Sequence, residues 1–176
     1  IQDVSSRGSQ PMTSSCGRYT LIYNGEIYNH VELRQRFLSL VPFNSDSDTE
    51  VLLHLLSRKG VREVIDLIDG MYAFAFIDHH AKKLTLARDL YGQKPLYFCI
   101  NERSIAFSSS LTAVKNIVTS CGESIELNKN AVLSFAELGF VQQPSTIWKG
   151  INRDLRLNLG VAAREKATKY SWHNYA

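Results

Sequence analysis

The stretch best suited to chemistry is residues 23–29, which read Tyr-Asn-Gly-Glu-Ile-Tyr-Asn. An alternating apolar run over residues 19–23 predicts a strand before it, and a helix-like run follows it. We therefore expect the strand to end at Asn24-Gly25 and to leave a backbone N–H and a side-chain amide free at its end. Two such donors side by side suit a negatively charged oxygen. The residues alone leave open a simple Asn-Gly turn without chemistry.

Helical periodicity surrounds this stretch on its C-terminal side. Asn29, with Glu32 three residues later, predicts an N-cap and capping-box partner for a helix that ends before Pro42. The polar run 45–50 opens a second helix, which Gly60 ends. Further helices are predicted over residues 61–68, over residues 111–118, and from an Asn128 cap to residue 138.

Strand-like periodicity occupies the middle of the chain. Strands are predicted over residues 71–77, 83–87, 95–100 and 104–108, with hairpin turns at 79–81 and 101–103. These short connections predict an antiparallel meander. A strand, then helices, then strands indicates an α+β layered domain rather than a βαβ series.

The composition excludes several classes of protein. The chain has 176 residues with 44% hydrophobic and 21% charged residues, which is enough for one domain with a substantial core. Its net charge of +3 is too small to argue for a nucleic acid or an anionic membrane as partner. The three cysteines, Cys16, Cys99 and Cys121, lack metal-ligand spacing and favour a reducing, cytoplasmic compartment. The chain begins with Ile1 instead of Met, so we expect it to be a piece of a longer polypeptide.

Five phrases in order carry a resemblance to a known family. They are Gln10-Pro11-Met12, residues 23–29, Ser47-Asp48-Thr49-Glu50-Val51, residues 69–75 and residues 87–97. Together they resemble the N-terminal glutaminase domain of glutamine-hydrolysing asparagine synthetases, a class II glutamine amidotransferase. The resemblance implies the N-terminal-nucleophile hydrolase fold, an αββα sandwich of two antiparallel sheets between helical layers.

The resemblance also implies roles for individual residues. The Asn24 side chain and the Gly25 N–H match the family's oxyanion hole, and Asp48 matches the carboxylate that holds the α-ammonium of glutamine. Glu26 flanks the same group, as a weaker assignment. For Asp48, a helix N-cap is the alternative reading. Arg88 and Asp89 are expected to form a buried ion pair that orders the sheet beside the site, without a catalytic role.

The resemblance implies parts that this chain does not contain. The nucleophile should be a cysteine at the mature N-terminus, upstream of Ile1, with its α-amine as base. We expect an amidotransferase domain over residues 1–150 and an irregular tail over 151–176, toward an absent synthetase half. No cofactor or metal is expected for the glutaminase step, whereas the synthetase half implies ATP and magnesium. The expected partners are glutamine and, through ammonia channelling, the synthetase half. The oligomeric state is left open, with a homodimer as one of the assemblies.

Two alternatives remain open at this point. The nitrogen could go to another acceptor, as in the enzymes of glucosamine-6-phosphate or phosphoribosylamine synthesis. The chain could also be a non-catalytic module that keeps the fold as an assembly or regulatory surface. Asn24, Gly25 and Asp48 occurring together favour the glutaminase.

Overall fold

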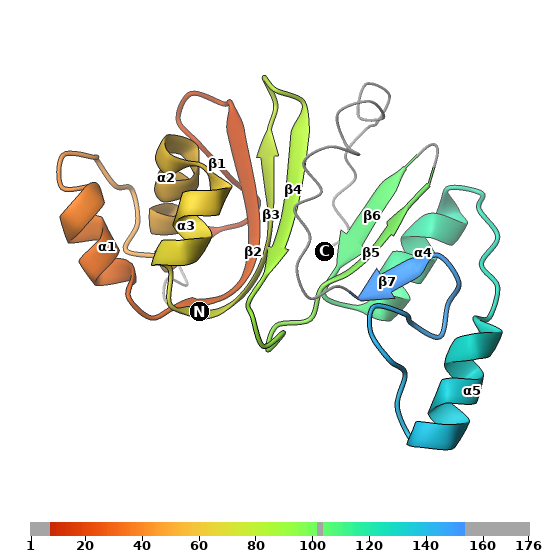
Figure 1. Cartoon of the computed structure of the whole chain (residues 1–176). Helices are drawn as coiled ribbons and strands as arrows, with labels where there is room; N and C mark the ends of the chain where they lie inside the picture. The colour runs from red at the N-terminus through yellow and green to blue at the C-terminus, as the bar shows by residue number, and fades with distance from the viewer. Residues whose placement is uncertain (1–7, 102–103, 154–176) are drawn as a thin grey trace.

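The protein folds into two antiparallel β-sheets with helices on both outer sides. The structure, a computed structural model, describes residues 8–101 and 104–153. Its elements are β1 (Met12–Thr13), β2 (Tyr19–Ile27), α1 (His30–Phe37), α2 (Asp48–Lys59), α3 (Val61–Leu67), β3 (Gly70–Asp78), β4 (Lys83–Arg88), β5 (Tyr97–Ile100), β6 (Ile105–Ser108), α4 (Leu111–Ser120), α5 (Lys129–Leu138) and β7 (Ile151–Arg153). Figure 1 shows α1–α3 on the outer side of the first sheet and α4 against the second.

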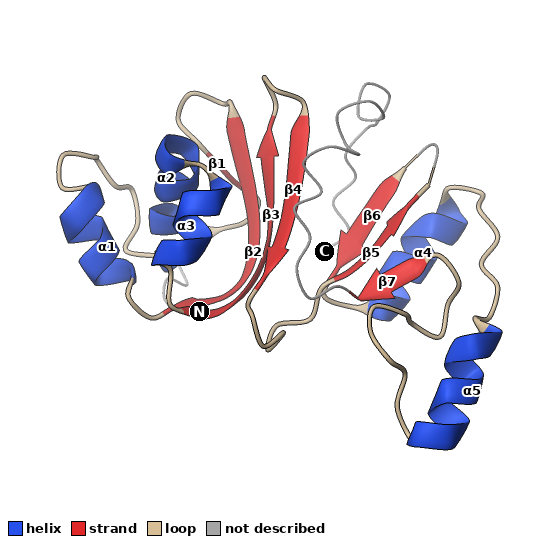
Figure 2. Ribbon diagram, viewed as in Figure 1, coloured by secondary structure: helices blue, strands red, loops and turns tan. Residues whose placement is uncertain are grey.

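The layers are held together by three apolar clusters. The first sheet has the strand order β1-β2-β3-β4, and the second has the order β6-β5-β7 (Figure 2). One cluster lies between α1–α3 and the first sheet, with Leu21 and Phe74 at its centre. A second joins the two sheets through residues such as Leu86 and Phe98, and a third joins the second sheet to α4. The expected αββα sandwich is therefore confirmed.

Two expectations about individual elements were wrong, and two short strands had not been predicted. The strands over residues 71–108 do not form one meander, because β3 and β4 belong to the first sheet, whereas β5 and β6 belong to the second. Asn29 precedes α1 but makes no capping bond, because its side-chain amide bonds Leu67 and Asp69 instead. The strands β1 and β7 were not expected. They have two and three residues, too few to show a period.

The C-terminal part of the described chain extends the domain past its predicted boundary at residue 150. Ile151 is buried in the third cluster, and β7 pairs with β5, so residues 151–153 are strand rather than irregular tail. Residues 154–176 of that predicted tail lie outside the described residues. The predicted Asn128 cap of α5 is confirmed, since its side chain accepts a hydrogen bond from the Ala131 N–H at 3.3 Å. In the part of the chain that the structure describes, no helix is both long and apolar enough to cross a membrane.

Arg88 and Asp89 shape the loop by which the chain leaves the first sheet for the second. The Asp89 carboxylate accepts hydrogen bonds from the N–H groups of Gln93 at 2.9 Å and Lys94 at 3.1 Å. The buried Arg88 guanidinium donates to the carbonyl oxygens of Gly92 and Lys94. Burial by itself would raise the pKa of Asp89, but the backbone donors and the nearby Arg88 charge lower it overall. Both side chains therefore fold the same loop through its backbone.

The other end of the first sheet is fastened by an ion pair. Arg18 precedes β2 and donates two hydrogen bonds to the Asp78 carboxylate, at 2.8 and 3.1 Å. Asp78 ends β3 and also accepts from the N–H groups of His80 and Ala81 in the hairpin. The Arg18 bonds, ahead of these backbone donors, lower the pKa of Asp78 from 3.8 to about 2.

Replacing Gly92 tests the Arg88 loop. Gly92 has φ +63°, and an added Cβ would lie 2.6 Å from Cζ of Arg88. Gly139 is the matched control, since its φ is +77° but an added Cβ would meet nothing within 4 Å. We expect both alanine variants to lose about 1–2 kcal/mol from left-handed backbone strain, and Gly92→Ala to lose about 1–3 kcal/mol more from the clash. Equal free energies of unfolding in urea would contradict this role of Arg88.

The Asp78 ion pair predicts a pH-dependent stability. Because its folded pKa lies below 3.8, Asp78 stabilises the fold above that pH and stops doing so as the pH falls through about 2. Asp78→Asn should therefore lower the free energy of unfolding near neutral pH, and the deficit should shrink between pH 3.8 and about 2. Asp46→Asn is the control, because Asp46 pairs with Arg34 through a side chain that is 97% exposed. A deficit that does not change with pH would contradict the prediction.

Candidate functional site

The free edge of β2 presents a row of backbone N–H groups. In an antiparallel pair, the N–H groups of a strand point alternately toward its partner and away from it. The Tyr28 N–H bonds the Asp69 carbonyl on the β3 side, so even-numbered residues of β2 face β3. Tyr23, Gly25 and Ile27 therefore direct their N–H groups to the opposite edge.

Two of these three N–H groups are bonded within the described part of the chain, and the middle one, of Gly25, is not. The Tyr23 N–H donates to the Gln10 side-chain oxygen at 2.5 Å, and the Ile27 N–H donates to Oδ2 of Asp48 at 2.9 Å. No acceptor for the Gly25 N–H is found among the described residues. Gly25 therefore offers a hydrogen-bond donor at this edge, between two anchored neighbours.

The edge is open because β1 covers only part of it. Met12 of β1 pairs with Leu21, and Gln10 lies beside Tyr23, two residues further along β2. The described chain before β1 therefore follows the edge of β2 in the direction of Gly25. Backbone pairing with β1 ends short of that residue.

The structure corrects the expected end of the strand at Asn24-Gly25. Asn24 pairs with Ala73 and Gly25 with Tyr72, and the ladder continues to Ile27. A Cβ on Gly25 would lie 2.2 Å from the carbonyl oxygen of Met71 in β3. Glycine is needed here because the two backbones approach so closely, not because the chain turns. Among the described residues the Gly25 N–H has no acceptor, and it lies at the side of the strand rather than at its end.

Asn24 and Glu26 lie on the face of β2 that points away from α1–α3. Leu21, Tyr23 and Ile27 belong to the helix-facing cluster, so the alternating side chains of Asn24 and Glu26 face the other way. Asn24 is exposed and Glu26 is half-buried. The Asn24 amide is exposed and has no hydrogen-bond partner among the described residues, so it could donate to a ligand beside the Gly25 edge.

Asp48 approaches the same edge from the helix side. Its carboxylate is buried, with 4% of the residue exposed, and Oδ2 accepts from the Tyr23 hydroxyl at 2.8 Å as well as from the Ile27 N–H. Both bonds end on Oδ2, so Oδ1 remains for a further donor. The alternative of an Asp48 N-cap was wrong, because Ser47 caps α2 and accepts from the Glu50 N–H.

Glu50 holds the turn that delivers Asp48, a role that the sequence reasoning missed. Its buried carboxylate accepts from the Asn44 N–H at 2.9 Å and from the Ser45 N–H and hydroxyl, both at 2.7 Å. The signal was the spacing Ser47-x-x-Glu50, the pattern of a capping box. The roles of Gln10 and of the Tyr23 hydroxyl were also missed, because they depend on contacts between distant segments.

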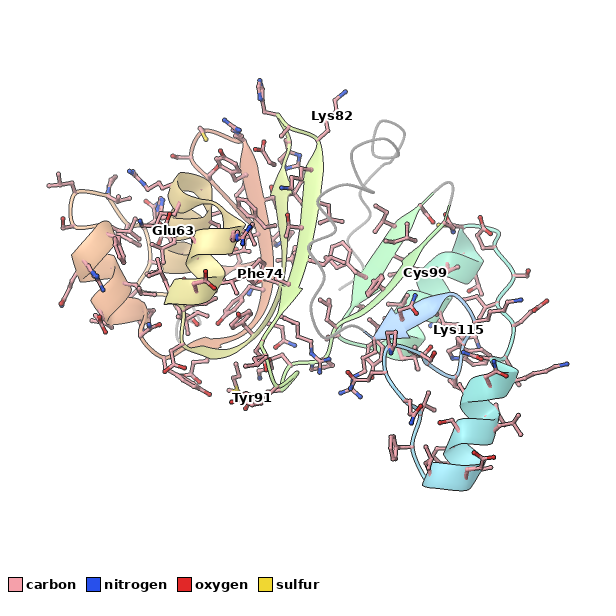
Figure 3. The ribbon with its side chains drawn as sticks, in the orientation of Figure 1. Glu63, Phe74, Lys82, Tyr91, Cys99 and Lys115 are labelled. Carbon is pink, nitrogen blue, oxygen red and sulfur yellow. The ribbon has the colours of Figure 1, made fainter. Side chains whose placement is uncertain are left out.

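Arg88 and Asp89 lie across the sheet from the Gly25 edge. Tyr72 pairs with Gly25 on one side, and on the other its carbonyl accepts from the Asp89 N–H while its N–H donates to the Asp89 carboxylate at 3.3 Å. Tyr91, in the same loop, is labelled in Figure 3 at the end of the sheet opposite Lys82. The loop therefore borders the part of the sheet that carries Gly25.

The three cysteines lie away from this edge. Cys16 is exposed in the turn before β2, and Gly25 lies six steps along the strand from Tyr19, which is about 20 Å. A hydrogen bond with the Ser14 hydroxyl, more than any other cause, lowers the pKa of Cys16. Cys99 is buried in the second sheet (Figure 3), where burial raises its pKa, and Cys121 follows α4. Across the described residues, no three His, Cys, Asp or Glu side chains gather in a way that could hold a metal ion.

The chain matches known proteins along its length. Residues 1–176 match the family described as glutamine amidotransferase domain. The chain is 37% identical over 144 residues to asparagine synthetase [glutamine-hydrolyzing] 1 of Bacillus subtilis, covering 80% of this chain and 22% of that protein. It is 30% identical over 189 residues to a putative asparagine synthetase [glutamine-hydrolyzing] of Methanocaldococcus jannaschii, covering 98% of this chain and 36% of that protein. The chain therefore spans about a fifth to a third of the length of these relatives.

Solved structures share the fold. The glutamine phosphoribosylpyrophosphate amidotransferase of B. subtilis, complexed with ADP and GMP, matches with a TM-score of 0.55 and 25% sequence identity. The match covers 64% of this chain and 27% of that chain. The expected family is thus confirmed by sequence and by fold, and the chain belongs to the glutamine amidotransferase domain family, with glutamine-hydrolysing asparagine synthetases among its sequence relatives.

Proposed function

We propose that this chain is the glutaminase domain of a glutamine-hydrolysing asparagine synthetase. It binds glutamine at the β2 edge, releases ammonia from the side-chain amide, and supplies that ammonia for the amidation of aspartate. The observation that carries this proposal is the open Gly25 N–H, which lies on the same edge as the N–H that anchors Asp48.

The spacing of the edge suits glutamine. Gly25 and Ile27 are two residues apart on one strand, which corresponds to about 6.6 Å. Five bonds separate the amino nitrogen of glutamine from its side-chain oxygen, which is about 6 Å when extended. Glutamine therefore has about the length that separates the Gly25 N–H from the N–H that anchors Asp48, which supports an amide oxygen at Gly25 and an ammonium beside the Asp48 carboxylate.

These residues would act on charge at both ends of the substrate. Attack on the amide carbon places negative charge on its oxygen, and the Gly25 N–H and the Asn24 amide would donate to that oxygen. Oδ1 of Asp48 would accept from the ammonium, which keeps its charge throughout the reaction. Glu26 faces away from the helix side and keeps its weaker assignment, as a neighbour of the ammonium.

The attacking group in this proposal is the thiolate of an N-terminal cysteine with its α-amine as base. The thiolate bonds to the amide carbon, the C–N bond breaks, and the amine's newly acquired proton leaves with ammonia. Water then hydrolyses the thioester to glutamate and restores the thiol. No cofactor takes part in this half-reaction.

The acceptor is the finer part of the proposal. The relatives from B. subtilis and M. jannaschii are named as asparagine synthetases, and this chain corresponds to 22–36% of their length. Activation of aspartate by ATP and magnesium would belong to the rest of such a protein. The cytoplasm is the compartment that fits this chemistry and the free thiols.

Asn24→Ala tests the oxyanion hole in the intact protein. Asn24 is exposed, so the change leaves no cavity. Loss of one donor to the developing charge should lower kcat for glutamine hydrolysis by about 10²–10³-fold. Asparagine synthesis from added ammonia should be unaffected, because it bypasses the glutaminase. An unchanged glutamine-dependent rate would rule out this role of Asn24.

Residues 1–176 alone provide a second test. None of the three cysteines lies at the Gly25 edge or carries the α-amine, so we expect no ammonia release from glutamine above background. The measurement is ammonia and glutamate production with purified residues 1–176. If release occurs, Cys16→Ser, Cys99→Ser and Cys121→Ser would show which thiol is responsible, and the proposed mechanism would be wrong.

A further inference from the structure

Tyr23 connects Asp48, which would bind the ammonium of glutamine, to β2, the strand that carries the proposed oxyanion hole. Its ring packs in the helix-facing cluster and only 7% of the residue is exposed. Its hydroxyl donates to Oδ2 of Asp48 at 2.8 Å, while its own N–H is held by Gln10. One side chain thus reaches from the middle of β2 to the first residue of α2.

The phenol is suited to be a permanent donor. Burial, and then the negative charge of Asp48, raise the pKa of Tyr23 far above its ordinary value of 10, so the hydroxyl stays protonated. A neutral phenol donates one hydrogen bond, and here the acceptor is the carboxylate. The Tyr23 hydroxyl is therefore a donor in this bond and not an acceptor.

The two bonds to Oδ2 fix the rotation of the Asp48 carboxylate. The terminal torsion of an aspartate side chain is broad, so packing alone does not set it. The Ile27 N–H and the Tyr23 hydroxyl approach the same oxygen, at 2.9 and 2.8 Å. With only the Ile27 N–H left, the carboxylate could turn about that single bond and present either oxygen.

We propose that Tyr23 is a positioning residue, which holds Oδ2 of Asp48 so that Oδ1 is directed to the α-ammonium of glutamine. This inference rests on the proposed function, because it gives Asp48 a ligand. It adds that recognition of the amino group depends on a tyrosine of the oxyanion-hole strand itself.

A purely structural role for Tyr23 makes a different prediction. If the hydroxyl only holds α2 against β2, its loss would lower the stability of the fold and weaken the binding of both substrates equally. If it orients Oδ1, its loss would weaken only substrates that carry the ammonium. Glutamine and its analogue without the α-amino group, 4-carbamoylbutyrate, separate these cases.

The variant is Tyr23→Phe in the intact protein, which keeps the ring and removes the hydroxyl. We expect KM for glutamine to rise about 10-fold, since hydrogen bonds to charged groups are worth at least this factor. The kcat should change little, because the ammonium is bound equally in ground state and transition state. The preference for glutamine over 4-carbamoylbutyrate, measured as the ratio of kcat/KM values, should fall by the same factor.

Tyr72→Phe is the matched control. Tyr72 is another buried tyrosine of the same cluster, 5% exposed and stacked on Phe74 at 5.8 Å between ring centroids. Tyr72→Phe also removes a phenol hydroxyl, but it leaves the Asp48 carboxylate with both of its donors. The preference for glutamine over 4-carbamoylbutyrate should therefore stay at the wild-type value. A preference in Tyr23→Phe equal to that in Tyr72→Phe would overturn the inference.

The double variant Tyr23→Phe/Asp48→Asn tests whether Tyr23 acts through Asp48. If it does, the double variant should discriminate the two substrates no worse than Asp48→Asn alone. If the two substitutions lower the preference for glutamine additively, the inference about Tyr23 is overturned, whereas binding of the ammonium by Asp48 still stands. If Asp48→Asn itself leaves the preference for glutamine unchanged, Asp48 does not bind the ammonium, and the inference about Tyr23 fails as well. The Asn24→Ala result then decides separately whether the oxyanion hole stands.

Discussion

The alternation of backbone donors along β2 is the constraint on which the site depends. A strand paired on one side turns only every second N–H to its other side. On β2 those are the groups of Tyr23, Gly25 and Ile27, and the middle one lacks a described acceptor because β1 pairs with β2 no further than Leu21. A longer β1 would have bonded the Gly25 N–H and removed the donor. The short first strand is therefore a condition for the site.

The close contact of β2 with β3 keeps that donor in place. A Cβ on Gly25 would meet the Met71 carbonyl oxygen at 2.2 Å, and one on Gly70 would meet the Glu26 carbonyl oxygen at 2.1 Å. Each glycine thus lies directly against the neighbouring backbone, which fixes the edge more firmly than side-chain packing alone would. The Asp89 carboxylate supports the same region from the far side of Tyr72. These backbone contacts hold the donor in place, and electrostatic stabilisation of a transition state requires donors that are preorganised in this way.

Burying two carboxylates beside this edge is costly unless each is fully hydrogen-bonded. Glu50 meets this condition with three groups of residues 44–45, which are neighbours in sequence. Among the described residues, Asp48 meets it on one oxygen only, with two groups from β2. The difference separates a carboxylate that builds a turn from one that, on the proposed function, retains an acceptor for the ammonium of glutamine. It also explains why α2 is capped by Ser47, since an Asp48 turned back to cap its own helix could not reach β2.

The sequence predicted the layers well and the local geometry of the site less well. Strong periodicities located the helices α1 to α5 and the strands β2 to β6 of the described chain, because burial on one face leaves a pattern over many residues. Periodicity could not show that β4 and β5 belong to different sheets, because their separation depends on the side chains that fold the loop at Asp89. Asn24-Gly25 was mistaken for the end of a strand, since glycine serves both turns and close backbone contacts. The Tyr23–Asp48 hydrogen bond joins residues 25 positions apart, so no local sequence pattern predicts it.

One strand carrying both ends of the site has a consequence for specificity. On the proposed function, the oxyanion donor and the anchor of the ammonium grip are separated by the pitch of β2, about 6.6 Å for two residues. Asparagine is one carbon shorter than glutamine, so it could reach one end of this edge but not both. The spacing of residues along a regular strand cannot shrink to fit the shorter substrate. A misplacement of the reacting group by about 1 Å can lower the rate 10²-fold. Discrimination against the shorter amide would then follow from backbone geometry, without a side chain that excludes it. Tyr23 fits the same logic, because it ties Asp48 to the strand whose repeat sets the distance.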